Sequence, residues 1–264
     1  MQIEQYSDSR GNRIEWSGEP IANTEVTFRG SGNRLVVHSP VKFGRVAIQF
    51  DCDNGVVEIS SSVGVPAFIA TIRVGQDSTV VIGPNVSTTG SLGISATEGT
   101  TVSIGEDCMF AIGVQLRADD GHPIFDVATG HRVNVSRDIV VGDHVWLGYN
   151  STVLGGVSIG SGAVIGFGSI VTKAVPNNSV AAGNPARIVR RDIAWERPHL
   201  SLVEPYYKPD ASTVEKTRWW AMSDDEAVPV ARGVSSRTVE SDSPRLEEER
   251  AKSKSTSART WWRR

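Results

Sequence analysis

Aliphatic residues recur every six positions between Val141 and Pro176. One column consists of Val141, Leu147, Val153, Ile159, Ile165 and Val171. A second column, four residues further on, consists of the small or β-branched residues Val145, Ser151, Val157, Ala163, Ser169 and Val175. Six is a multiple of the two-residue strand period and does not fit the 3.6-residue helix period, so the pattern predicts short strands joined by tight corners. Hexapeptide repeats of this kind are typical of a parallel β-helix, and the sequence therefore predicts an all-β solenoid.

The repeat also predicts which residues stack. If three sixes make one triangular coil, as in the left-handed form of this fold, residues eighteen apart lie above one another, with strands about 4.8 Å apart. Val141 should then lie under Ile159, and Leu147 under Ile165. Burial of an aliphatic side chain contributes roughly 1.5 to 3 kcal/mol, while ordering each residue costs roughly 1 to 2 kcal/mol. Six such side chains do not hold this stretch alone, so we expect more coils and further subunits.

Weaker hexads precede this stretch. They consist of Leu35, Val41 and Ala47; then, after a slip, Val57, Val63 and Ile69; then Val74, Val80, Val86 and Leu92; and finally Ile104, Phe110 and Leu116, with Glu98 in the slot between the last two sets. We therefore expect the β-helix to cover residues 35–183. Residues 1–34 are polar and contain several glycines, and they are expected to form a lead-in or an irregular first coil.

One interruption breaks the array between Leu116 and Val141, where the spacing is not a multiple of six. This segment contains Gly121, Pro123 and Gly130, together with several carboxylates. It is expected to be a loop extruded from the coils over residues 117–140. Loops on a rigid repeat scaffold commonly carry the chemistry, so this loop is the first place to look for an active site.

The end of the array is expected to be capped by a helix. Asn184 is suited to the N-cap position and Pro185 to the first helical position, which predicts a short closing helix over residues 184–200. Periodicity then vanishes, and residues 201–264 are expected to be a disordered tail. The pairs Trp219–Trp220 and Trp261–Trp262 in this tail are either a docking motif or have no partner.

Composition narrows the function classes. The net charge of −3 gives no basic field for nucleic acid. No apolar run predicts a signal peptide or a membrane span, so a cytoplasmic location is expected. The two cysteines, Cys52 and Cys108, have no metal-ligand spacing and are expected to be reduced thiols.

The hexads, the closing stretch VAAGNPARIV and the loop motif DGHPIFD together resemble the hexapeptide-repeat acyltransferases. Within that family they are most similar to O-acetyltransferases of capsular polysaccharide and polysialic acid, over residues 35–197. The resemblance implies acetyl-coenzyme A as the acetyl donor, a saccharide hydroxyl as the acceptor and no required metal. It also implies a homotrimer with active sites between neighbouring subunits.

His122 in the motif DGHPIFD matches the catalytic histidine of the family. A neutral imidazole suits the removal of a proton from a sugar hydroxyl near pH 7. In an extended loop Asp120 points to the same side as His122 and could fix its tautomer. Trp146 matches a family tryptophan that walls the pocket for one of the two substrates. His144 follows a core aliphatic residue by three positions and is expected to point outward into solvent, and His131 is a weaker candidate because the family more often has an acid there.

Donor binding is expected along one edge of the stacked corners. Gly148 and Tyr149 precede Gly166 and Phe167 by eighteen residues, so the two pairs should line one edge that a pantetheine arm could follow. The family usually has a small residue at the position of Phe167, so this side chain either narrows the channel or stacks on the ligand.

Three cations are candidates for the phosphates of coenzyme A. Lys173, Arg187 and Arg190 match family positions that meet those phosphates. The residues alone fit a solvated basic face equally well.

Other functions remain open. Within the enzyme class the alternative is an N-acetyltransferase that acts on an amino sugar, and outside it the alternative is a non-catalytic β-helix scaffold. A zinc enzyme of the γ-carbonic anhydrase type shares the fold, but it uses two histidines four residues apart, and His122, His131 and His144 contain no such pair.

Overall fold

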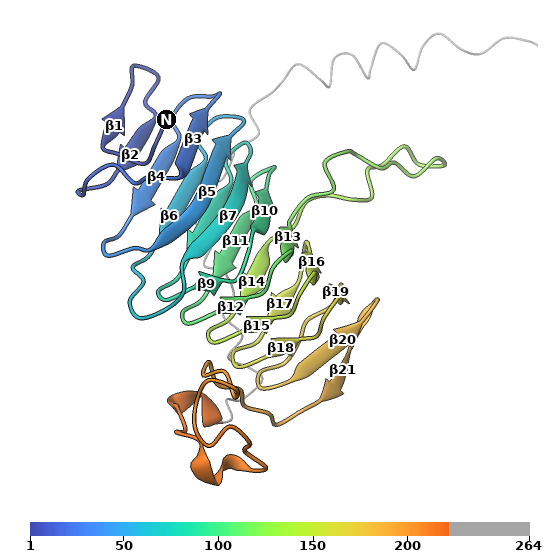
Figure 1. Cartoon of the computed structure of the whole chain (residues 1–264). Helices are drawn as coiled ribbons and strands as arrows, with labels where there is room; N and C mark the ends of the chain where they lie inside the picture. Colours follow the sequence, from blue (N-terminus) through green and yellow to red (C-terminus); the bar gives the residue numbers. More distant parts are fainter. Residues whose placement is uncertain (222–264) are drawn as a thin grey trace, which may run out of the picture. The chain divides into compact units, whose positions relative to one another are not determined.

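Strands from successive coils stack into three sheets in the computed structural model, which describes residues 1–221 (Figure 1). The eight-stranded sheet contains, in spatial order, β1 (Tyr6–Ser7), β2 (Arg13–Glu15), β4 (Arg34–Val37), β6 (Val56–Ile59), β8 (Thr79–Ile82), β11 (Thr101–Ile104), β14 (Ile139–Val141) and β17 (Ser158–Ile159). The seven-stranded sheet contains β19 (Ile170–Val171), β16 (Thr152–Leu154), β13 (Gln115–Arg117), β10 (Leu92–Ala96), β7 (Phe68–Val74), β5 (Phe43–Phe50) and β3 (Thr24–Phe28). The six-stranded sheet contains β21 (Ala186–Arg190), β20 (Val180–Gly183), β18 (Val164–Ile165), β15 (Trp146–Leu147), β12 (Met109–Phe110) and β9 (Ser87–Thr88). The predicted solenoid of parallel strands is confirmed.

The strand register confirms the predicted stacking in the C-terminal coils. Val141 pairs with Ile159, Leu147 with Ile165, and Val153 with Val171. All six side chains are buried in one continuous core. Inward aliphatic residues at each eighteenth position therefore form the core of this half, as the hexads require.

The N-terminal coils are longer, and this shifts the phase of their hexads. Leu35 pairs with Val57 and Val57 with Val80, which are 22 and 23 residues apart. Their corners hold extra residues, so a six-residue count drifts out of phase with the strands. The predictions for Ala47, Val63 and Ile69 are accordingly wrong, because Ala47 and Ile69 alternate with the buried residues of β5 and β7 and Val63 is 66% exposed.

The solenoid also begins earlier than Leu35. Ile3, Ile14 and Val26 are buried in the same core, and β3 pairs in parallel with β5 from Thr24 to Phe28. Residues 1–34 thus form part of the coils, which agrees with an irregular first coil and not with a polar lead-in.

The predicted closing helix over residues 184–200 is wrong. The chain instead folds back after β20, and β21 pairs with β20 in antiparallel orientation. Gly183 has φ of 103°, a conformation that glycine adopts without a Cβ clash and that reverses the chain there. Ile188 and Val189 favour the strand, and β21 covers the edge that β20 would otherwise leave unpaired.

Residues 193–197, which we call the strap, cross the corner between the eight-stranded and six-stranded sheets. Ile193 N donates to Asn178 O (3.0 Å), and Trp195 Nε1 donates to His144 O (3.0 Å). Arg197 reaches a further coil, where its Nε donates to Asp107 Oδ1 (2.5 Å). The strap therefore joins several coils from outside, and Arg197 Nη1 also donates to Ser87 Oγ (2.8 Å) one coil beyond Asp107.

Two short 3-10 helices, η1 (Ala211–Thr213) and η2 (Arg218–Trp220), follow the strap. The expectation of disorder is wrong for residues 201–221, since Trp219 stacks on His144 with ring centroids 5.1 Å apart. The rest of the expected tail, residues 222–264 with Trp261 and Trp262, lies outside the described residues. Within residues 1–221 no helix has the length and apolarity needed to cross a bilayer.

Candidate active site

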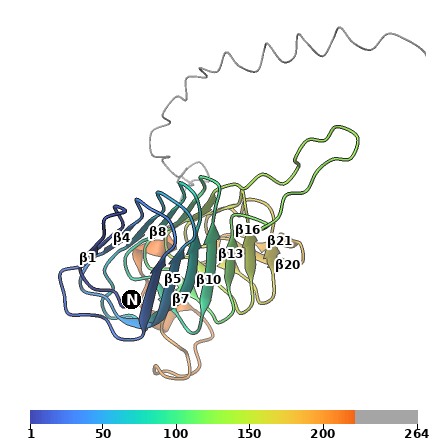
Figure 2. The same cartoon turned by 90° about the horizontal axis from the view of Figure 1, so that it is seen from above.

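Residues 118–138, which we call the arm, leave the coils between β13 and β14 and project away from the solenoid (Figures 1 and 2). The two feet of the arm meet where Arg137 N donates to Ala118 O (3.1 Å). Further out the two legs pair like a hairpin, since Val133 N donates to Ile124 O and Asp126 N to His131 O, each at 2.8 Å. The predicted extruded loop is therefore an ordered arm with two paired legs.

The outgoing leg is fixed to the solenoid by a buried carboxylate. Asp119 Oδ2 accepts from Ser95 Oγ at 2.5 Å, and Asp119 Oδ1 accepts from Gly121 N at 3.0 Å. Arg73 lies 3.7 Å from the same Oδ1. Asp119 thus ties the residue just before His122 to two strands of the seven-stranded sheet.

The returning leg is fixed by Glu98, which occupies the slot that the hexads left without an aliphatic residue. Glu98 sits in a turn with φ of 59°, and its two oxygens accept from Arg132 Nη1 (2.8 Å) and Ser136 Oγ (2.6 Å). These hydrogen bonds, first that of Arg132 and then that of Ser136, lower the pKa of Glu98 to about 2. Both legs are therefore anchored at their base.

His122 lies between the anchored base and the paired legs, with its side chain exposed. Its ring has no hydrogen-bond partner within residues 1–221, and its carbonyl oxygen accepts from Asn134 Nδ2 (2.8 Å). The same Nδ2 donates to Asp120 Oδ2 (2.9 Å). The expected pairing of Asp120 with the His122 ring is not formed here, because Asn134 holds the carboxylate. A cavity of about 200 Å³ adjoins Asp120 and Asn134 at the base of the arm.

A second group of expected site residues forms what we call the aromatic edge: Trp146, Tyr149 and Phe167. Trp146 is 38% exposed on β15. Tyr149 and Phe167 follow β15 and β18 and stack with ring centroids 5.5 Å apart and planes 11° apart. The eighteen-residue spacing expected for the two rings is thus realised as a stacked pair on the surface.

The glycines beside these rings are explained by coil stacking. A Cβ on Gly148 would lie 2.7 Å from Ile165 O, and a Cβ on Gly166 would lie 2.9 Å from Ala182 Cβ. Real side chains do not come this close, so both positions require glycine whether or not a ligand follows that edge.

The three candidate cations lie near the C-terminal end of the solenoid. Lys173 follows β19 in the corner that leads to the eight-stranded sheet, and the arm leaves the same corner two coils earlier. Arg187 and Arg190 lie on β21. All three side chains are exposed, and none makes an ion pair within residues 1–221.

The expected site residues therefore fall into two groups within one chain. The arm, which carries His122 and Asp120, lies at the junction of the seven-stranded and eight-stranded sheets, and Lys173 lies at the same junction. Tyr149 and Phe167 lie at the junction of the six-stranded and seven-stranded sheets, whereas Trp146, Arg187 and Arg190 lie on the six-stranded sheet itself. The six-stranded sheet lies across the solenoid core from the corner that the arm leaves, so a single copy does not bring His122 to Trp146.

The other two histidines differ from expectation in opposite ways. His131 is exposed near the tip of the arm. His144 was expected to be solvated and is instead 1% exposed, with Nδ1 2.6 Å from Asp107 Oδ2 and Nε2 3.0 Å from Trp195 O. Burial tends to raise the pKa of Asp107, but the hydrogen bond from His144 and the charge of Arg197 together lower it. His144 is therefore part of the strap attachment and does not face a substrate.

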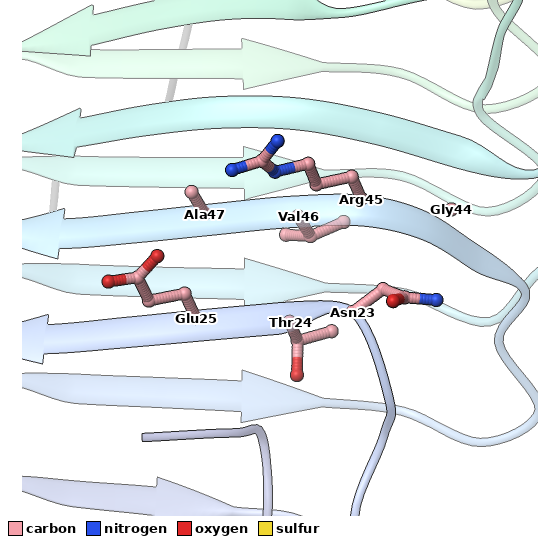
Figure 3. Close-up of a pocket in the computed structure, with 7 residues that line it drawn as sticks. All are labelled: Asn23, Thr24, Glu25, Gly44, Arg45, Val46 and Ala47. Carbon is pink, nitrogen blue, oxygen red and sulfur yellow. The ribbon is translucent and has the colours of Figure 1, made fainter.

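One further depression lies far along the chain from these groups. It has a volume of about 440 Å³ and lies between the starts of β3 and β5 (Figure 3). Glu25 and Arg45 contribute its charged side chains. It contains none of the expected site residues.

Asn134, which sequence reasoning did not single out, lies at the centre of the arm. Its only signal in the sequence is that it is a polar residue within the interrupting loop.

Comparisons with known proteins identify the family. A family model described as bacterial transferase hexapeptide (six repeats) matches residues 138–173. A polysialic acid O-acetyltransferase of Neisseria meningitidis is 32% identical over 158 residues, which cover 59% of this chain and 72% of that protein. A protein of the same description from Escherichia coli O1:K1 is 45% identical over 101 residues, which cover 38% of this chain and only 33% of the relative's length.

A solved structure gives the same result in three dimensions. The crystal structure of the polySia-specific acetyltransferase NeuO matches with a TM-score of 0.66 and 36% identity, and the match covers 74% of this chain and 91% of that chain. The repeats, the arm and the relatives all lead to one assignment, and the chain belongs to the hexapeptide-repeat acetyltransferase family that includes the polysialic acid O-acetyltransferases.

Proposed function

We propose that this protein transfers an acetyl group from acetyl-coenzyme A to a hydroxyl of a saccharide, either a surface or capsular polysaccharide or its precursor, in the cytoplasm. The observation that carries the proposal is the position of His122, an exposed imidazole whose ring has no hydrogen-bond partner among residues 1–221, on an arm anchored at both legs. A free imidazole on a rigid support is what a general base requires. Family membership supports the acetyl group as the group transferred.

In this reaction His122 takes the proton of the acceptor hydroxyl while its oxygen attacks the thioester carbonyl. The new C–O bond forms, the C–S bond breaks, and the thiolate of coenzyme A leaves and is protonated. Backbone N–H groups or dipoles of the arm are suited to stabilise the oxyanion. The exposed cations Lys173, Arg187 and Arg190 are free to meet the phosphates of the donor.

We further propose that each site is formed by two copies in a homotrimer, with the arm of one copy meeting the aromatic edge of the next. The separation of His122 from Trp146 within one chain supports this arrangement. So does the surface of the arm, on which apolar side chains are exposed: Ile124, Phe125, Val127, Val133 and Val135. Exposed apolar side chains concentrated on one projecting segment are typical of a contact surface.

The activity is tested by incubating the purified full chain with acetyl-coenzyme A and a panel of sugars that includes polysialic acid. Acceptor-dependent release of free thiol is expected, and NMR of the product should place the acetyl group on oxygen. Acetylation of nitrogen in an amino sugar, or no release with any acceptor, would contradict the proposal.

The shared site is tested by complementation. His122→Ala and Trp146→Ala variants are each expected to be inactive, and co-folding them in equal amounts should restore about one quarter of wild-type activity, since one in four random interfaces then pairs an intact arm with an intact edge. If both residues act within one copy, no mixture regains activity. Mixing each variant with itself is the control.

A further inference from the structure

Asn134 uses all the hydrogen-bonding capacity of its amide inside the arm. Its Nδ2 donates to Asp120 Oδ2 (2.9 Å) and to His122 O (2.8 Å). Its Oδ1 accepts from Ile124 N (2.6 Å) and more weakly from Arg132 Nε (3.4 Å). An amide group has two donor hydrogens and two acceptor lone pairs, and here all four have partners.

These partners lie on both sides of His122. Asp120 precedes it by two residues and Ile124 follows it by two, so the side chain of Asn134 spans the whole turn that presents the ring. Asn134 itself belongs to the returning leg, whose neighbour Arg132 is bound to Glu98. Through this one amide, the turn that carries His122 is fixed to a leg that is anchored to the solenoid.

The polarity of the amide is also specific. The Nδ2 side faces two oxygens, the Asp120 carboxylate and the His122 carbonyl, and the Oδ1 side faces an N–H. A carboxylate at this position would keep the acceptor half, the oxygen that accepts from Ile124 N. It would replace the donor half, the Nδ2 group, by a second oxygen that faces the oxygens of Asp120 and His122. The site therefore requires an amide and not merely a polar side chain of this size.

We propose that Asn134 is a positioning residue for the transferase reaction, which sets the direction of His122 by holding the Asp120 carboxylate and the His122 backbone together. This inference rests on the proposed function, because it gives Asn134 a role only if His122 is the base. Displacement of a reacting group by about 1 Å can cost about 100-fold in rate, so loss of the donor half should lower kcat by roughly 10- to 100-fold. The cations proposed for the donor phosphates, Lys173, Arg187 and Arg190, lie outside the arm, so the KM for acetyl-coenzyme A should stay unchanged.

The experiment compares Asn134→Asp and Asn134→Ala in the full chain. The Asp variant keeps an acceptor for Ile124 N and loses the donors, whereas the Ala variant loses both. Thiol release gives kcat and KM, and hydrogen exchange of the Ile124 amide reports the acceptor half without any need for activity. Thr129→Ala is the matched control, since it removes the hydroxyl that donates to Asp126 Oδ1 and accepts from His131 N near the tip of the same arm.

We expect both Asn134 variants to lose kcat with an unchanged donor KM, and only the Ala variant to lose protection at Ile124. An Asp variant with wild-type kcat would overturn the positioning role and reduce Asn134 to a support for Ile124. A wild-type chain with no transferase activity would instead overturn the proposed function, while the exchange data would still show whether Asn134 orders the His122 turn. Loss of kcat in Thr129→Ala by the same factor would also contradict a specific role for Asn134.

Discussion

The imidazole of His144 lies flat against the indole of Trp195, with ring centroids 3.9 Å apart and planes 11° apart. The indole of Trp219 stacks parallel to the same ring at 5.1 Å. The Nδ1 of His144 lies 2.6 Å from Asp107 Oδ2, and its Nε2 lies 3.0 Å from Trp195 O. This stack attaches the strap to the solenoid, and Trp195 also approaches Trp146 of the aromatic edge, with ring centroids 6.0 Å apart.

Replacing Trp195 should release the strap while leaving the coils folded. Trp195 is 8% exposed, and loss of a buried tryptophan costs about 3 kcal/mol, which corresponds to a fall on the order of 100-fold in local protection. In Trp195→Ala the amide of Ile193, which donates to Asn178 O, should therefore exchange much faster, whereas the amides of β14 and β17 should not change. Trp16→Ala at the other end of the solenoid is the control. Equal protection of Ile193 in wild type and Trp195→Ala would show that the strap is held without this stack.

Glu98 should titrate far below its ordinary pKa. The hydrogen bonds from Arg132 and Ser136 favour the ionised carboxylate in the folded chain and lower its pKa from 4.5 to about 2. A lowered pKa means that the stabilisation of the arm by Glu98 is fully present above pH about 4.5 and is lost as the pH falls toward 2. NMR of the Glu98 carboxyl carbon against pH measures the midpoint directly.

Arg132→Gln should move that midpoint back toward 4.5, because the largest contribution to the shift is removed. Arg117→Gln removes a charge on β13 that makes no bond to Glu98 and serves as the control. A wild-type midpoint near 4.5 would mean that the returning leg is not bound to Glu98 in solution.

His122→Ala should lower turnover by roughly 100- to 10,000-fold, the usual contribution of a general base. The side chain is exposed and its ring makes no hydrogen bond within residues 1–221, so the thermal unfolding midpoint should not change. His131→Ala, on the same arm and also exposed, should keep wild-type turnover. Near-normal turnover of a purified His122→Ala enzyme would exclude His122 as the base.

Lys173→Ala should weaken the binding of acetyl-coenzyme A without slowing the chemical step. A lost hydrogen bond to a charged phosphate corresponds to a rise of roughly 10-fold in the KM for acetyl-coenzyme A, with kcat unchanged. Lys42→Ala, an exposed lysine at the N-terminal end, should change neither constant. A fall in kcat at constant KM would contradict the phosphate role.

Gly148→Ala should destabilise the solenoid by about 1 to 3 kcal/mol, because the new Cβ meets a backbone oxygen that cannot move without shifting the next coil. Gly93 offers a matched comparison, since a Cβ there meets only the end of the flexible Gln115 side chain. Denaturant unfolding of the two variants should give a clearly larger loss for Gly148→Ala. Equal losses of stability in the two variants would mean that the neighbouring coil shifts to accommodate the Cβ at Gly148.

The hexads predicted the core of the C-terminal coils down to individual pairs such as Val141 with Ile159. They did so because an eighteen-residue coil keeps each inward residue in phase with the one below. In the N-terminal coils the corners hold extra residues, so the same reasoning placed Val63 inside while the structure exposes it. The closing helix failed because the cap and proline signals at Asn184 and Pro185 describe only a local preference. The edge of β20 provides backbone hydrogen-bond partners for β21, and a local sequence signal does not reveal such partners.

The site was predictable to a lesser extent. His122 and Trp146 were predicted through family motifs, but their separation within one chain depends on which sheet or corner each occupies, and the spacing alone does not give that. His144 was misjudged because its partners Trp195 and Trp219 are distant in sequence. Asn134 was missed because its role depends on hydrogen bonds across the arm, which leave no periodic signal.

The feet of the arm have a consequence for how this scaffold can vary. Ala118 O and Arg137 N meet at 3.1 Å, so the chain leaves and re-enters the coil at nearly the same point. In the next coil only Gly155, Gly156 and Val157 separate β16 from β17 at the same corner. The arm is thus an insertion at one corner, and its outer part can change in length without moving the strands stacked on either side. Under the proposed function, the segment that presents the base can therefore vary independently of the core.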